Sequence, residues 1–172
     1  MAPKILVVDD HEIVREGIRT LIGRSRPDWV ICGEASNAKE ALEAVRRLNP
    51  DVVILDITMP GTSGLEAAMG IAEVGHSKVL MFTMHESEWL GTEVRNVGAQ
   101  GYVLKSQAAR DLVLAIESLL RGGTFFGASS ERPESYRDKP PGGLAFCKSL
   151  AHAIAKGLSM QRLCADTRLQ PW

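Results

Sequence analysis

Short apolar runs alternate with longer segments of helical periodicity through the first 127 residues of the chain. The apolar runs are rich in β-branched residues and predict five buried strands, at residues 5–8, 29–32, 52–55, 79–82 and 102–104. Between them, apolar positions recur at helical spacing, and the first such face consists of Val14, Ile18, Leu21 and Ile22. Four more helical faces follow, and Asn37 with Glu40 has the pattern of a capping box at the start of the second.

This alternation of strand and helix predicts an α/β domain. Five consecutive strand–helix repeats are typical of a doubly wound parallel sheet with helices on both faces, because each crossover must return the chain to begin a parallel strand. We therefore expect a five-stranded parallel sheet followed by a C-terminal tail. In open sheets of this kind, ligands bind beyond the carboxyl ends of the strands.

Polar residues follow four of the five predicted strands at the point where each strand ends. Asp9 and Asp10 follow the first strand, Asp56 the third, Thr83 the fourth and Lys105 the fifth. Since parallel strands end at the same edge, these side chains are expected to converge, and three carboxylates in one crevice call for a cation or for raised pKa values. Oxygen ligands favour Mg²⁺. An ionised Asp can also form an aspartyl phosphate, and we assign Asp56 as the acceptor.

Composition narrows the class of protein without changing this interpretation. The 172 residues are 45% hydrophobic and 24% charged, with a formal net charge of −1, which is ordinary for a globular protein and favours neither a nucleic-acid nor a membrane partner. The apolar runs are too short to span a bilayer, and the N-terminus does not resemble a signal peptide. The three cysteines are widely separated, which predicts reduced thiols and a cytoplasmic location.

Four motifs resemble those of the receiver domain of bacterial two-component response regulators. They are Val-Val-Asp-Asp-His at 7–11, Asp-Ile-Thr-Met-Pro-Gly at 56–61, Thr-Met-His-Glu at 83–86 and Gly-Tyr-Val-Leu-Lys at 101–105. The sequence Asp-Asp-His-Glu-Ile-Val-Arg at 9–15 is similar to the corresponding motif of the NarL/FixJ (LuxR-type) subfamily. The resemblance covers residues 4–126 and implies a flavodoxin-like fold with strand order 2-1-3-4-5.

The resemblance also implies a site and a partner. Mg²⁺ would be held by Asp10, Asp56 and the backbone carbonyl of Thr58, with Asp9 acting through water. Asp56, Thr83 and Lys105 would carry the phosphoryl-transfer chemistry. The phosphoryl group on Asp56 would come from a histidine kinase or a small acyl phosphate, as in a two-component phosphorelay.

A conformational switch is a further implication of the resemblance. Thr83 would move to bond a phosphoryl oxygen, and Tyr102 would rotate into the vacated space. That change would remodel the surface made by the fourth helix, the fifth strand and the fifth helix, which family members use to form homodimers or to release an output domain. Thr58 and His85 would flank the site and tune the lifetime of the phosphate.

The sequence predicts three segments, and the last two differ from the first in composition and charge. Residues 1–127 form the receiver domain, residues 128–143 a linker, and residues 144–172 a short basic tail. The segment 128–172 has 7 basic and 4 acidic residues. Subfamily members carry a helix-turn-helix domain after such a linker, but this tail does not match a complete one, which argues against direct DNA binding by this chain. A truncated or out-of-frame remnant, a disordered extension and a helical arm all stay open.

Two other functions use the same residue types. An aspartyl-phosphate phosphohydrolase also needs an Asp nucleophile, a Thr, a Lys and Mg²⁺, but it requires a general acid two residues after the nucleophile, where this chain has Thr58. A pure interaction module that takes no phosphate is the other alternative. We expect a phosphoacceptor switch, not an enzyme, with at most slow self-dephosphorylation.

Overall fold

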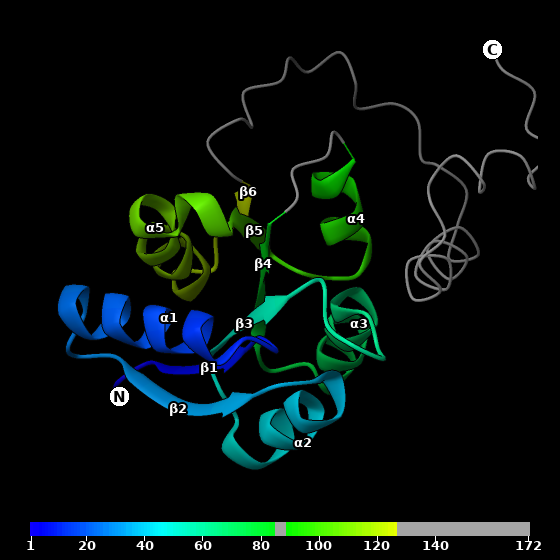
Figure 1. Cartoon of the computed structure of the whole chain (residues 1–172), viewed down its shortest axis with the longest axis horizontal. Helices are drawn as coiled ribbons and strands as arrows, with labels where there is room; N and C mark the ends of the chain where they lie inside the picture. The colour runs from blue at the N-terminus through cyan, green and yellow to red at the C-terminus, as the bar shows by residue number, and fades with distance from the viewer. Residues whose placement is uncertain (85–88, 127–172) are drawn as a thin grey trace, which may run out of the picture. The chain divides into compact units, whose positions relative to one another are not determined.

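The computed structural model describes residues 1–84 and 89–126, which form alternating strands and helices (Figure 1). The predicted tail and His85 lie outside the described residues. The strands are β1 (Lys4–Val8), β2 (Val30–Ala35), β3 (Val52–Asp56), β4 (Lys78–Thr83), β5 (Gly101–Leu104) and β6 (Phe125–Phe126). The helices are α1 (Glu12–Ser25), α2 (Ala38–Leu48), α3 (Gly64–Val74), α4 (Leu90–Asn96) and α5 (Ala108–Leu120), with a 3₁₀ turn η1 (Lys105–Gln107) before α5.

Within the described residues the strands form a single parallel sheet of the predicted order. The order is β2-β1-β3-β4-β5-β6. Strand β1 therefore lies between β2 and β3, and the later strands are added in turn beyond β3. The doubly wound, flavodoxin-like fold and the order 2-1-3-4-5 are therefore confirmed. The sheet has one strand more than expected, because β6 consists of two residues and is too short to produce a periodic signal in the sequence.

The sheet is covered by helices on both faces, with α1 and α5 on one side and α2, α3 and α4 on the other (Figure 1). Alternate residues of each central strand point to opposite faces, so each strand contributes to both hydrophobic cores. In β3, Ile54 packs into the core under α1 and α5, whereas Leu55 packs into the core under α2, α3 and α4. Both side chains are fully buried, which explains why the strands appear in the sequence as continuous apolar runs.

The start of helix α2 has one of the two hydrogen bonds that its capping-box sequence predicts. The Asn37 side chain accepts a hydrogen bond from the Glu40 N–H at 3.0 Å, as the capping pattern predicted. The reciprocal bond differs, because Glu40 Oε2 accepts from the Ser36 N–H at 2.8 Å and not from Asn37. The helix ends at Asn49, whose left-handed conformation (φ 47°) is the type that closes helices.

The helices of the described region are amphipathic or short. No helix in residues 1–84 or 89–126 combines the length and the apolar character that crossing a bilayer requires. The fifth helix ends before a glycine turn, in which the Gly122 N–H donates to the Leu119 carbonyl and Gly122 takes a positive φ of 81°.

Candidate functional site

The strand register brings the predicted polar residues to one edge of the sheet. Val8 of β1 pairs with Leu55 of β3, so the next residues, Asp9 and Asp56, emerge side by side. Asp56 and Thr83 are the last residues of β3 and β4, and Lys105 follows the last residue of β5. Residues separated by nearly one hundred positions in the sequence therefore lie at one edge of the sheet. We call this edge, with Asp9, Asp10, Asp56, Thr83 and Lys105, the rim.

Lys105 links two of the three carboxylates at this rim. Its Nζ donates a hydrogen bond to Asp56 Oδ2 at 2.8 Å and lies 2.7 Å from Asp9 Oδ2. The side chain of Lys105 is 10% exposed, and those of Asp9 and Asp56 are almost completely buried. Asp9 Oδ2 and Asp56 Oδ2 therefore both form ion pairs with the same ammonium group.

Backbone donors hold the same carboxylates in place. The His11 N–H donates to Asp9 Oδ1 at 2.9 Å, and the Thr58 N–H donates to Asp56 Oδ1 at 3.2 Å. Each carboxylate thus has one oxygen held by the turn that follows it and the other facing Lys105. This arrangement orients the acids toward each other despite their mutual repulsion.

The carboxylates form a cluster that could hold a cation. Ligand atoms of Asp9, Asp10, His11 and Asp56 all lie within 4.8 Å of one another. Asp9 Oδ2 and Asp10 Oδ1 are buried oxygen atoms, which lie 2.7 Å from Lys105 Nζ and 2.9 Å from His11 Nδ1, respectively. Several carboxylate oxygens gathered at one poorly solvated site are the ligands that a hard cation prefers, so the residues present fit Mg²⁺.

His11 is a member of this cluster that the sequence did not indicate. The side chain of His11 is 64% exposed, and the residue directly precedes α1. Its Nδ1, however, lies 2.9 Å from Asp10 Oδ1. Only the folded turn reveals this contact, because neighbouring side chains on a chain can point in many directions.

Burial and charge shift the pKa values at the rim. Burial raises the pKa of Asp56 above its ordinary value, although the hydrogen bond and charge of Lys105 oppose this effect. Burial alone would lower the pKa of Lys105, but its contacts with Asp56 and Asp9 outweigh burial and raise the pKa. Lys105 is therefore held as a cation between two acids.

Thr83 and Tyr102 lie on adjacent strands beside this rim. Thr83 is 1% exposed at the end of β4, and Tyr102 of β5 is half-buried. The Tyr102 ring makes an edge-to-face contact with Phe126 of β6 at 6.2 Å between ring centroids. Thr58 is exposed in the loop after β3.

Gly64 is a residue whose importance the sequence did not reveal. It is the first residue of α3, and a Cβ at this position would lie 1.9 Å from the backbone oxygen of Asp56. Only glycine lets the helix approach the end of β3 so closely. The only indication in the sequence of this close approach is a glycine directly after Thr62 and Ser63, shortly after the Met-Pro-Gly turn.

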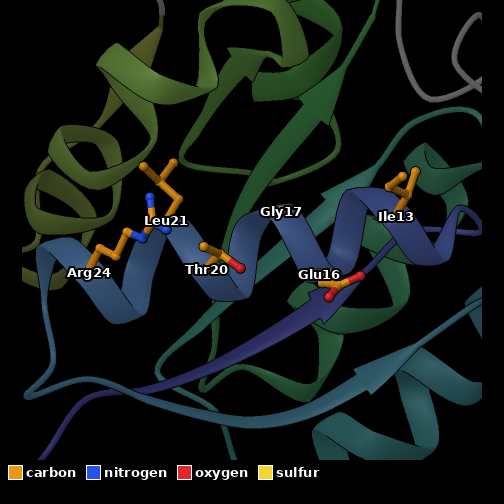
Figure 2. A pocket seen from close by; sticks show the side chains of 6 residues that line it. All are labelled: Ile13, Glu16, Gly17, Thr20, Leu21 and Arg24. Atoms are coloured by element: carbon orange, nitrogen blue, oxygen red, sulfur yellow. The ribbon is translucent and has the colours of Figure 1, made fainter.

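A shallow hollow on the outer face of α1 is separate from this chemistry (Figure 2). It is lined by Ile13, Glu16, Gly17, Thr20, Leu21 and Arg24, which follow one another along the helix. None of the strand-end residues lines it.

Comparison with known proteins agrees with this geometry. Residues 5–117 match the family model described as the response regulator receiver domain. The chain is 37% identical over 122 residues to the transcriptional regulatory protein YdfI of Bacillus subtilis (strain 168), which covers 71% of this chain and 57% of that protein. It is 38% identical over 125 residues to the response regulator UvrY of Escherichia coli (strain K12), covering 72% and 57%.

A solved structure is similar over the same region. The crystal structure of a LuxR-family two-component response regulator from Aurantimonas sp. SI85-9A1 superposes with a TM-score of 0.70 at 40% identity, covering 74% of this chain and 91% of that one. The chain spans just over half the length of the curated relatives. With its parallel sheet, its acidic rim and these matches, the chain belongs to the response regulator receiver domain family, of the NarL/FixJ type.

Proposed function

We propose that this chain receives a phosphoryl group on Asp56 and acts as a two-component phosphoacceptor switch. The observation that carries the proposal is the position of the Lys105 ammonium between Asp56 and Asp9 at the carboxyl edge of the sheet. A cation beside the acceptor neutralises the charge on a phosphoryl group entering the rim. The same contact favours the ionised form of Asp56, which a nucleophile requires, and opposes the burial that raises the pKa of Asp56.

In the proposed reaction, a carboxylate oxygen of Asp56 forms the new bond to phosphorus. The bond between phosphorus and the donor's leaving atom breaks, and that atom keeps the electron pair. Lys105 and the hydroxyl of Thr83 would stabilise the phosphoryl oxygens. The donor would be a histidine kinase or a small acyl phosphate.

Mg²⁺ is the cation that we propose for the acidic cluster. Asp10, Asp56 and the backbone carbonyl of Thr58 would hold it, with Asp9 acting through water. When bound, Mg²⁺ supplies positive charge against the phosphoryl oxygens. The clustering of the ligand atoms of Asp9, Asp10 and Asp56 within 4.8 Å of one another supports this assignment.

We further propose that Thr83 and Tyr102 transmit the change to the surface of α4, β5 and α5. Both residues lie at the end of the sheet that carries this surface, and Trp89 beside α4 is 55% exposed, as aromatic residues at contact surfaces often are. A homodimer through this surface is the proposed consequence. Thr58, and His85 outside the described residues, would tune the lifetime of the phosphate.

Slow self-dephosphorylation is the only turnover that we propose. Thr58, two residues after Asp56, provides a backbone N–H to the acceptor and no carboxyl group that could act as a general acid or base. This is the position at which a phosphohydrolase needs one. The observation favours a switch over an enzyme.

Intact-mass measurement after treatment with acetyl phosphate and Mg²⁺ tests the proposal. The wild-type chain is expected to gain one phosphoryl group, and chelation of Mg²⁺ is expected to prevent the gain. Asp56→Asn is expected to gain none, whereas the control Asp28→Asn, which changes an exposed acid, is expected to behave as wild type. Equal phosphorylation of wild type and Asp56→Asn would refute the acceptor, and no phosphorylation of wild type would favour an interaction module.

A further inference from the structure

Arg15 closes the motif at residues 9–15, and the proposed function gives it no role. It lies at the end of the first turn of α1, and its guanidinium reaches back toward the start of the helix, the direction in which helical side chains project. The side chain is 16% exposed, which is low for an arginine near a helix start. Its polar atoms are therefore held by the protein to a large extent.

The guanidinium of Arg15 bridges strand β2 and the turn that follows β1. Its Nη1 donates to the backbone carbonyl of Asp9 at 2.8 Å, and its Nε donates to Glu34 Oε2 of β2 at 3.0 Å. Arg19, one turn further along α1, also binds Glu34, through Oε1, but within the described residues it makes no hydrogen bond to Asp9. Glu34 thus binds both arginines. Of the two, Arg15 also binds the turn that contains Asp9 and Asp10.

The contact with the Asp9 carbonyl determines how the next residue is presented. The carbonyl of Asp9 and the Cα of Asp10 belong to one planar peptide unit, so holding the carbonyl restricts the position of the Asp10 Cα from which the side chain leaves. The preceding peptide is held too, because the Asp9 N–H donates to the Ala35 carbonyl at 3.1 Å. Arg15 adds a side-chain constraint to those that the Ala35 carbonyl and the His11 N–H place on this turn.

We propose that Arg15 is a positioning residue for the cation site, acting through the Asp9 carbonyl on the carboxylate of Asp10. The inference rests on the proposed function, because it takes the acidic cluster to be the cation site. Arg15 touches neither the acceptor nor the phosphoryl group. Without it, the peptide between Asp9 and Asp10 can rotate, and the acidic oxygens lose their common orientation.

Binding of Mn²⁺ to the full chain, measured from the electron paramagnetic resonance signal of the free ion with Mg²⁺ as competitor, tests this role. Mn²⁺ prefers the same oxygen ligands as Mg²⁺. Arg15→Ala is expected to bind the ion about tenfold more weakly than wild type, the effect typical of removing a group that orients a metal ligand. Arg19→Ala is the matched control, because it also removes a cation bound to Glu34, and it is expected to bind as wild type.

Two further variants complete the test. Arg15→Lys keeps the charge but lacks the fork that reaches both partners, so it is expected to restore part of the affinity. If Arg15→Ala does not fold, Arg15→Lys compared with Arg19→Lys decides the same question. Equal affinity of the Arg15 and Arg19 variants would overturn the role of Arg15 and leave the cation site intact, whereas absence of binding by wild type would overturn both.

Discussion

At the scale of single residues, the charge of one lysine at the rim compensates the charges of two buried carboxylates. Asp9 and Asp56 tolerate burial because Lys105 lies within 2.8 Å of both. A buried ion pair contributes little by itself, but removing one partner leaves an uncompensated charge in a poorly solvated place. The same residue that would help to bind a phosphoryl group therefore also stabilises the resting protein.

Lys105→Met is expected to destabilise the protein in metal-free buffer by about 3 kcal/mol at neutral pH, because two buried carboxylates lose their cation. The loss should shrink toward about pH 4, as protonation begins to neutralise Asp56. This sign follows because a carboxyl whose folded-state pKa is raised, as burial raises that of Asp56, favours the folded state at low pH. Urea unfolding at both pH values measures the difference.

The control is Lys39→Met, which changes an exposed lysine of α2. It is expected to alter the free energy of unfolding by less than about 0.5 kcal/mol at either pH. A loss for Lys105→Met that does not depend on pH would show that its packing, and not its charge, matters.

At the scale of the elements, the site depends on how closely α3 approaches β3. The Gly64 N–H donates to the Ile57 carbonyl at 2.9 Å, and the backbone of Asp56 occupies the space where a side chain at 64 would lie. The N-cap Ser63 then accepts from the Leu65 N–H and starts the helix at this point. The loop between acceptor and helix is consequently held at both ends.

Gly64→Ala is expected to lower the free energy of unfolding by about 2 kcal/mol, because the new Cβ must displace backbone atoms. It should also slow phosphorylation by acetyl phosphate, since the displaced atoms belong to the proposed acceptor. Gly17→Ala is the matched control: a Cβ there meets nothing within 4 Å on the outer face of α1. That change should stabilise the helix by about 0.5–1 kcal/mol. Equal effects of the two substitutions on stability would contradict the close approach.

At the scale of the whole molecule, the site exists only when the sheet is assembled. Its side chains come from the ends of four strands, and the hydrogen bond from Lys105 to Asp56 joins residues 49 positions apart. The cores on both faces of the sheet hold these strands in register. No part of the sheet smaller than β1, β3, β4 and β5 contains the complete rim.

Loss of Mn²⁺ binding in urea is therefore expected to coincide with loss of the far-ultraviolet circular dichroism of the full chain. Leu80→Ala, which removes a fully buried side chain of β4, should shift both transitions by the same amount, equivalent to about 3 kcal/mol. Leu114→Ala removes a leucine of α5 that is 55% exposed and should shift neither by more than about 0.5 kcal/mol. Metal binding lost well before the circular dichroism would show that the rim opens independently.

Local patterns in the sequence determined much of this protein. Apolar runs and helical faces predicted the first five strands and the five helices, and parallel strands leave no choice about which edge receives the residues that follow them. The expected meeting of Asp9, Asp56 and Lys105 is confirmed for that reason. The catalytic, metal-binding and switching roles of these and the other site residues stay predictions.

Other features were decided only by the tertiary structure. The clearance at Gly64, the contact of His11 with Asp10, the bridge of Arg15 to Asp9 and the short strand β6 all depend on distances between elements. Periodicity reports which face of an element is buried, but it contains no information on how closely two backbones approach or which rotamer a polar side chain adopts. Packing of the complete sheet and its helices sets these distances, because only then do the register and the two cores leave one arrangement for each side chain.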